Sequence, residues 1–289
     1  MNIIKGNDIW LAVSVNLSEG DKDIASSIFY DLGCNGISEN PDGLTAFFDG
    51  KKHDEDALRD AISKELAAFP ALAYVQIEIT SEYVGDWSER WKQHFKPFEI
   101  APGVIVAPSW EAFRPEEGQT AIELDPGMAF GTGLHPTTRL CASSLVSILH
   151  HTKIPRPSLL DLGTGSGILS ILGRKLDLGR IAAVDNDPDA LRVARENLSK
   201  NDCADVEMFG DIRDVEGRFQ IVIANILLST LIELRPEIEK RSSPGGWLVL
   251  SGITHDQEVE ISTAFSGSFS DAVIYRDGEW SAIVCRRRN

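Results

Sequence analysis

The residues best suited to chemistry lie in a glycine-rich stretch near the middle of the chain. Residues 161–167 read Asp-Leu-Gly-Thr-Gly-Ser-Gly, between an apolar pair and an apolar run. Glycine lets a backbone turn tightly and approach a ligand, because it has no Cβ and adopts positive φ at little cost. The helix start that follows offers free N–H groups and the positive end of a dipole. This pattern of strand, turn and helix predicts a nucleotide-like ligand.

The glycine spacing and the preceding acid indicate which ligand. The fingerprint of dinucleotide-binding proteins is G-x-G-x-x-G, whereas here the third glycine comes one residue earlier. A carboxylate at Asp161 would repel a pyrophosphate but suits a ligand with an ammonium group. S-adenosylmethionine has an ammonium group and no phosphate. We therefore predict that Asp161, Gly163 and Gly165 contact S-adenosylmethionine; a plain glycine turn without a ligand is the alternative.

Polar residues follow the later strands at corresponding positions. Asp185 ends the next apolar strand, about 20 residues after Gly163, the spacing of the acid that binds ribose hydroxyls. Asp211 and Asn225 follow two further apolar runs. Ligands of open α/β sheets bind beyond the carboxyl ends of the strands, so these four residues should face one crevice. Asp187, before Pro188, is interpreted as a helix cap.

Composition limits the class of protein. The chain has 289 residues, 43% of them hydrophobic, which allows two ordinary domains. A net charge of −16 disfavours DNA and RNA as ligands and favours a basic protein partner. We find no membrane span or signal segment and expect a soluble, cytoplasmic protein. The four cysteines lack metal-ligand spacing, so we expect free thiols and no metal.

The chain divides into three parts. Residues 1–80, with a net charge of −8, show the order strand, helix, strand, strand, helix, strand, which predicts a ferredoxin-like α+β domain. In residues 81–100, Trp87, Trp91 and Phe95 fall on one helical face and predict a linker helix. Residues 101–289 alternate strands and helices, which predicts an α/β domain with a mostly parallel sheet.

A loop precedes the nucleotide-binding part. Residues 125–138 contain three glycines, two prolines and no periodicity, and their hydroxyl and apolar side chains suggest that the loop lines a pocket. It is placed to close over the crevice. Thr137 or Thr138 is predicted to cap the helix that follows.

Several segments together resemble a known family. The loop at 125–138, the turn at 161–167, Ala-Asn-Ile-Leu at 224–227 and Gly-Glu-Trp at 278–280 are similar to the PrmA family, the methyltransferases of large-subunit ribosomal protein L11. The resemblance runs from about residue 87 to the end of the sequence. It implies a class I, Rossmann-like S-adenosylmethionine-dependent methyltransferase domain over 101–289. It also implies that residues 1–80 recognise the basic ribosomal protein of the stalk base.

The resemblance also implies site residues and a reaction. By position, cofactor contacts would come from Thr138, Gly163, Asp185 and Asn225, while Phe130, Gly131 and Thr132 would lie over the methionine end of the cofactor. Methyl groups would pass to lysine ε-amines, the N-terminal α-amine, or both. As a hypothesis, Asn225 is the catalytic residue and orients the cofactor or the amine through its carbonyl oxygen.

Other functions stay open at this point. The family often has cysteine where this chain has Thr164, which changes little because the backbone binds the cofactor there. It usually has small residues or proline where this chain has 228–230, beside the expected acceptor pocket, so the acceptor is less well defined. Another protein or a small amine is an alternative acceptor. A nicotinamide-dependent oxidoreductase would retain Asp185 but leaves Asp161 unexplained, and a non-catalytic binding protein would bind the cofactor without methyl transfer. The methylated amines and the oligomeric state are not predicted.

Overall fold

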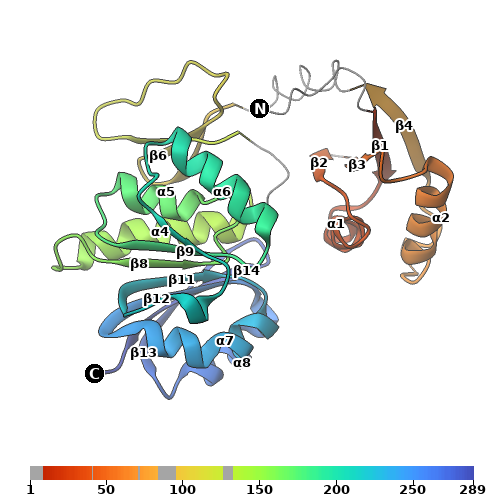
Figure 1. Ribbon diagram of the computed structural model, residues 1–289. Coiled ribbons are helices and arrows are strands. Elements are labelled where there is room, and N and C mark those ends of the chain that lie inside the picture. Colours follow the sequence, from red (N-terminus) through yellow and green to blue (C-terminus); the bar gives the residue numbers. More distant parts are fainter. Residues whose placement is uncertain (1–8, 41, 71, 84–95, 126–132) are drawn as a thin grey trace. The chain divides into compact units, whose positions relative to one another are not determined.

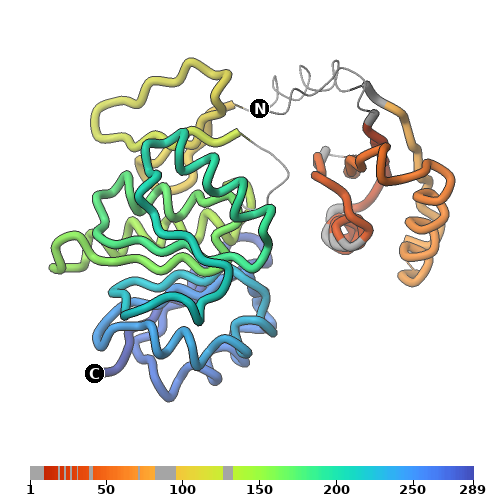
Figure 2. The backbone as a smooth tube through the Cα atoms, viewed as in Figure 1, coloured from red at the N-terminus to blue at the C-terminus, as the bar shows by residue number. Residues whose placement is uncertain are grey.

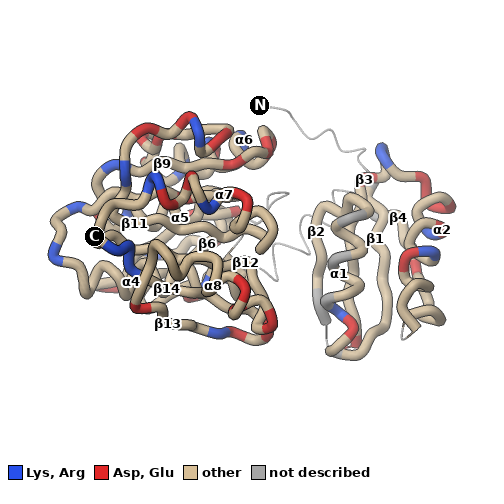
Figure 3. The backbone as a smooth tube through the Cα atoms, turned by 90° about the horizontal axis from the view of Figure 1, so that it is seen from below, with Lys and Arg blue, Asp and Glu red and all other residues tan. Residues whose placement is uncertain are grey.

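The computed structural model describes residues 9–40, 42–70, 72–83, 96–125 and 133–289, arranged in two compact units (Figure 1). The N-terminal unit comprises residues 1–95 and the C-terminal unit residues 96–289. Acidic side chains outnumber basic ones by 44 to 28, and Figure 3 shows both kinds on both units. Among the described residues, no helix is long and apolar enough to cross a membrane.

The N-terminal unit is a four-stranded antiparallel sheet packed against two helices. Its elements follow the predicted order: β1 (Ile9–Asn16), α1 (Lys22–Asp31), β2 (Gly36–Asn40), β3 (Gly43–Asp49), α2 (Glu55–Leu66) and β4 (Ile77–Tyr83). The strand order β2-β3-β1-β4 is that of a ferredoxin-like fold. Alternate strand residues such as Leu11, Val13 and Phe48 are buried with apolar residues of both helices. The last strand runs past residue 80, the boundary expected from the sequence.

The predicted linker helix is wrong at both ends. Residues 81–83 belong to β4, and Phe98–Ala101 form strand β5, which pairs with β6. Ile100 is buried in the core of the C-terminal unit, and this burial favours a strand over a continued helix. The middle of the predicted helix, with Trp87, Trp91 and Phe95, lies outside the described residues.

The C-terminal unit is built on a seven-stranded sheet in the order β10-β9-β8-β11-β12-β14-β13. The first five strands in that order run parallel, and β14 is antiparallel to both of its neighbours. The strands are β8 (Leu159–Leu162), β9 (Ile181–Val184), β10 (Glu207–Phe209), β11 (Phe219–Asn225), β12 (Ser242–Thr254), β13 (Phe269–Asp277) and β14 (Trp280–Arg287).

Helices cover both faces of this sheet (Figure 1). On one face lie α4 (Pro136–His151), α5 (Ile168–Lys175) and α6 (Pro188–Lys200); on the other lie α7 (Leu228–Arg241) and α8 (Glu258–Phe265). Strand residues alternate between the two cores: Leu159 and Ile223 pack toward α4 and α5, while Leu160 and Val222 pack toward α7 and α8. Burial on both faces explains the continuous apolar runs seen in the sequence.

A small three-stranded sheet precedes the large one. It consists of β5, β6 (Val104–Ala107) and β7 (Thr120–Glu123), and residues 108–119 make a long excursion between the last two (Figure 2). The helix after the 125–138 loop begins earlier than expected, with Pro136 in its first turn. His135, rather than Thr137 or Thr138, caps it: Nδ1 of His135 accepts from the backbone N–H of Thr137 at 3.3 Å. Proline favours the first helical turn, which moves the cap to the residue before it.

Candidate active site

Four parallel strands end at the same level and bring the predicted residues to one edge of the sheet. In the pairing register, Phe209 lies beside Val184, and Leu162 lies beside both Val184 and Ala224. The residues that follow these strand ends therefore line one edge, which we name the carboxyl edge. In spatial order they are Asp211, Asp185, Gly163 and Asn225.

The glycine turn at the carboxyl edge depends on glycine. Gly163, Gly165 and Gly167 have φ values of +75°, +53° and +83°, a region that other residues rarely adopt. A Cβ on Gly163 would lie 2.2 Å from Cγ2 of Ile226. Gly167 is the N-cap of α5, so the turn ends at a helix start. The order of strand, tight turn and helix predicted from the sequence is present, and contact of this turn with a ligand stays a prediction.

Asp185 connects the second strand to this turn. One carboxylate oxygen, Oδ2, accepts from the backbone N–H of Gly165 at 2.9 Å, and Oδ1 accepts from the N–H of Asp187 at 3.0 Å. Each carboxylate oxygen has a further lone pair, so both can still accept from a hydroxyl. Asp187 caps α6, as predicted, by accepting from the N–H of Asp189.

Asp161 lies behind the turn and is 1% exposed. Its Oδ2 accepts from the hydroxyls of Thr164 and Ser170, each at 2.7 Å, while Oδ1 has no partner among the described residues. Burial raises the pKa of this carboxyl, and the charge of Asp185 adds to that effect. Ser170 was missed from the sequence, although a serine within the apolar run 168–172 was a signal.

Three more buried side-chain atoms have no partner within the described part of the chain. One of them, Nε of Arg174, lies in the last turn of α5, at the end of that helix distant from the glycine turn. The other two are Oδ1 of Asn225, where β11 ends, and Oγ1 of Thr138 in the first turn of α4. Buried polar atoms are almost always hydrogen-bonded, and at a binding site a ligand can supply the missing partner. With Oδ1 of Asp161, those of Asn225 and Thr138 supply an anionic and two neutral oxygens, which suits an ammonium group and the hydroxyl and amine donors of S-adenosylmethionine. The residues present fit this cofactor.

The remaining predicted residues stand apart from this group. Both carboxylate oxygens of Asp211 accept from Arg213, which holds the pKa of Asp211 at about 2. A cofactor contact from Asp211 would have to share these oxygens, and it stays a prediction. Phe130, Gly131 and Thr132 lie outside the described residues.

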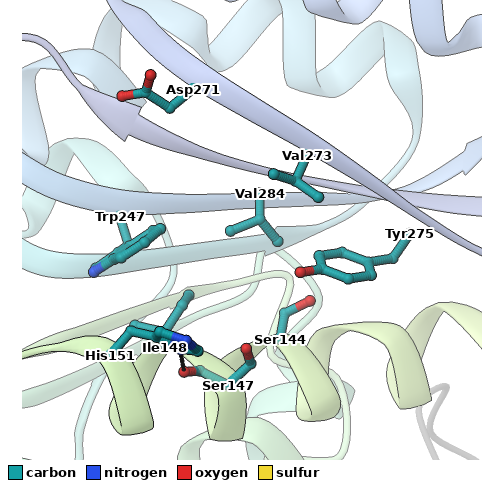
Figure 4. A pocket seen from close by; sticks show the side chains of 9 residues that line it. All are labelled: Ser144, Ser147, Ile148, His151, Trp247, Asp271, Val273, Tyr275 and Val284. Carbon is teal, nitrogen blue, oxygen red and sulfur yellow. Dashed lines mark hydrogen bonds between the residues drawn. The ribbon is translucent and has the colours of Figure 1, made fainter.

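A cavity elsewhere in the unit does not coincide with the site. It has a volume of about 190 Å³ and lies between α4 and the strands β12, β13 and β14 (Figure 4). Its walls include Trp247, Tyr275 and His151, whose Nδ1 lies 2.7 Å from the carbonyl oxygen of Ser147. None of the predicted site residues lines it. In the described ranges, no group of three or more His, Cys, Asp or Glu side chains is arranged to hold a metal ion.

The doubly covered sheet, the glycine turn and the polar residues at the carboxyl edge define a class I S-adenosylmethionine-dependent methyltransferase. Within that class, the family model for ribosomal protein L11 methyltransferase (PrmA) matches residues 9–288. The chain therefore belongs to the PrmA family, which confirms the resemblance noted in the sequence.

Individual relatives agree with this assignment. A ribosomal protein L11 methyltransferase of Geobacter sp. is 42% identical over 225 residues, which are 76% of this chain and 73% of that protein. The protein of the same name from Geotalea uraniireducens is 34% identical and covers 96% of this chain and 98% of its own length. The crystal structure of ribosomal protein L11 methylase from Lactobacillus delbrueckii subsp. bulgaricus is 30% identical with a TM-score of 0.61, over 68% of this chain and 100% of that chain.

Proposed function

We propose that this chain transfers methyl groups from S-adenosylmethionine to amine groups of ribosomal protein L11. The acceptors would be lysine ε-amines, the N-terminal α-amine, or both. The observation that supports this most directly is that buried oxygens of Asp161, Asn225 and Thr138 have no partner among the described residues, in a chain of the PrmA family. A ribosomal acceptor implies action in the cytoplasm.

The cofactor supplies a methyl group on a sulfonium, which is already a good leaving group. The protein then has to align the amine and exclude water, and alignment alone can contribute about 7–11 kcal/mol. A lysine with an ordinary pKa near 10.4 must first lose its proton, which costs about 5 kcal/mol at neutral pH. Oδ1 of Asn225 is proposed to accept a hydrogen bond from the amine or the cofactor and so orient it.

Charge supports a basic protein as the acceptor. The chain has a net charge of −16, of which residues 1–80 carry −8. Negative surfaces attract basic partners and increase the rate of encounter. We propose that the N-terminal unit binds the acceptor protein and that the C-terminal unit performs methyl transfer.

Incubation with isotopically labelled S-adenosylmethionine and purified L11, followed by mass spectrometry, tests the proposal. We expect label on L11 amines, and no label on a mixture of other ribosomal proteins. Label on other proteins but not on L11 would show that the chain is a methyltransferase with a different acceptor. Calorimetric titration with NAD and with S-adenosylmethionine distinguishes a methyltransferase from an oxidoreductase. A methyltransferase would bind S-adenosylmethionine, whereas an oxidoreductase would bind only NAD.

Asn225→Ala is the matching variant for the catalytic hypothesis. It removes the buried oxygen, and we expect methylation of L11 to fall at least tenfold, as for the loss of an oriented hydrogen bond. Measured kcat and the dissociation constant for S-adenosylhomocysteine show which step is affected. Full turnover together with full cofactor affinity would contradict a role for Asn225.

A further inference from the structure

A hairpin distant in sequence contacts the start of α4. Strands β13 and β14 are joined by residues 277–280, which we name the hairpin tip, with Asp277 paired to Trp280. Oδ2 of Asp277 accepts from Arg139 Nε at 3.0 Å and from Nη2 at 2.7 Å. The rings of Trp280 and His135 meet edge to face, with centroids 4.7 Å apart. The hairpin tip thus contacts α4 through an ion pair and a ring contact.

These contacts hold the short segment that contains Thr138. Arg139 also donates from Nη1 to the carbonyl oxygen of Leu134 at 2.7 Å, and the N–H of Thr138 donates to the carbonyl of His135 at 3.0 Å. His135 caps the helix. Residues 134–139 therefore form one bonded segment, and within it Oγ1 of Thr138 is buried and has no partner among the described residues.

The hairpin tip is itself fixed to the rest of the unit. Carboxylate oxygens of Glu258, at the start of α8, accept from Arg276 at 2.8 and 2.6 Å and from the hydroxyl of Ser281 at 2.5 Å. The N–H of His255 donates to the carbonyl oxygen of Glu279 at 3.2 Å. The hairpin tip is thus bonded to residues that follow β12, and it contacts α4 from this fixed position.

The residue before the segment, Gly133, packs closely against the start of α5, which follows the glycine turn. Gly133 has φ +92°, and a Cβ there would lie 3.0 Å from Ile168, the first residue of α5, and 3.1 Å from Ile100. The chain entering the segment is thus packed against α5, and the segment itself contacts the hairpin tip.

We propose that Asp277 and Trp280 are positioning residues, which hold the start of α4 so that Thr138 is ready for the cofactor. A site that is already arranged before binding loses less free energy in ordering itself, so its affinity is higher. When only a fraction of molecules has the competent arrangement, the apparent dissociation constant rises by the inverse of that fraction. The proposal concerns cofactor binding alone, so it stands or falls independently of the acceptor.

The test is Asp277→Ala, with Glu207→Ala as the matched control. The Arg139–Asp277 and Arg180–Glu207 pairs have the same 2.7 Å separation and similar exposure, 37% and 38% against 37% and 41%. Calorimetry with S-adenosylhomocysteine should show about fivefold weaker binding for Asp277→Ala, the most that a partly exposed ion pair contributes, and no change for the control. Thermal unfolding should shift equally in both.

With these two alanine variants, three results would overturn the proposal. The first is a dissociation constant for Asp277→Ala within twofold of that of the unmodified chain. The second is an equally large increase of the dissociation constant in the Glu207→Ala control. The third is a decrease in affinity that is fully explained by the decrease in melting temperature of the same variant. Arg139→Met breaks the same pair from the other side. The double variant should bind no more weakly than Arg139→Met alone, because the two residues act through one contact; additive losses would also contradict the proposal.

Discussion

At the scale of single residues, the two carboxylates near the glycine turn have different surroundings. Asp161 is buried behind the turn, and one of its oxygens has no partner among the described residues, while Asp185 lies at the end of the next strand and binds the N–H of Gly165. A buried carboxylate oxygen that is free to accept attracts an ammonium group, and an acid at the end of the second strand typically binds a ribose. We therefore propose that Asp161 faces the amino-acid end of the cofactor and Asp185 its nucleoside end.

These proposed roles predict that substitutions of the two carboxylates affect the binding of two ligands differently. S-adenosylhomocysteine has an ammonium group, whereas 5′-methylthioadenosine retains the ribose and adenine but lacks the amino acid. Asp161→Asn should weaken S-adenosylhomocysteine about tenfold or more, as for a hydrogen bond to a charged group, and leave 5′-methylthioadenosine unchanged. Asp185→Asn should weaken both. Calorimetry measures all four constants, and equal losses for both ligands in Asp161→Asn would refute the assignment.

At the scale of elements, the sequence predicted those features whose signals are local. The turn between β8 and α5 follows from the glycine spacing, and the cap of α6 follows from Asp187 before proline. The contact of the hairpin tip with α4 left no such signal, because Asp277 and Arg139 are 138 positions apart and only folding brings them together. The cap of α4 was misassigned because histidine is not among the common cap residues.

The attachment of α8 to the β13–β14 hairpin predicts a pH-dependent stability. Hydrogen bonds from Arg276 and Ser281 lower the pKa of Glu258 from 4.5 to about 2. A carboxyl whose pKa is lower in the folded than in the unfolded state stabilises the fold at pH values above its unfolded-state pKa. This contribution is lost as the pH falls from about 4.5 toward 2. Glu258→Gln should therefore lower the melting temperature at pH 7 by a few degrees, as for about 1 kcal/mol.

Melting curves from pH 7 down to pH 3 check this prediction. The difference between Glu258→Gln and the unmodified chain should shrink as the solution becomes acidic. Glu196→Gln, which removes an exposed partner of Arg192 within one helix, is the control and should change the melting temperature little. A difference that stays constant with pH would show that Glu258 stabilises the unit by packing and not by charge.

At the scale of the whole molecule, each unit has its own core and its own sheet. The buried clusters of the C-terminal unit draw only on residues from Ile100 onward, and that of the N-terminal unit ends at Ile79. Closed cores of this kind allow each unit to fold alone. The sequence predicted the two folds from element order, but its boundary at residue 80 fell inside β4, since strand ends are defined by pairing with β1.

A shortened chain of residues 96–289 tests the proposal that the N-terminal unit binds the acceptor and the C-terminal unit transfers the methyl group. We expect it to fold and to bind S-adenosylhomocysteine within about twofold of the full chain, because all the described site residues lie within it. Its methylation of L11 should fall at least tenfold, since the proposed recognition unit is missing. Circular dichroism, calorimetry and the labelling assay measure the three properties. Full activity on L11 would assign acceptor recognition to the C-terminal unit.

The position of β14 between β12 and β13 has a consequence for how the protein is made. The ribosome synthesises β12 and β13, the two neighbours of β14, before β14 itself. Until β14 is made, β13 therefore has no strand to pair with, while the parallel part of the sheet can already form. Trp280 opens that late strand, and its contact with His135 forms only then. During synthesis the contacts that hold the start of α4 are therefore among the last in the unit to form.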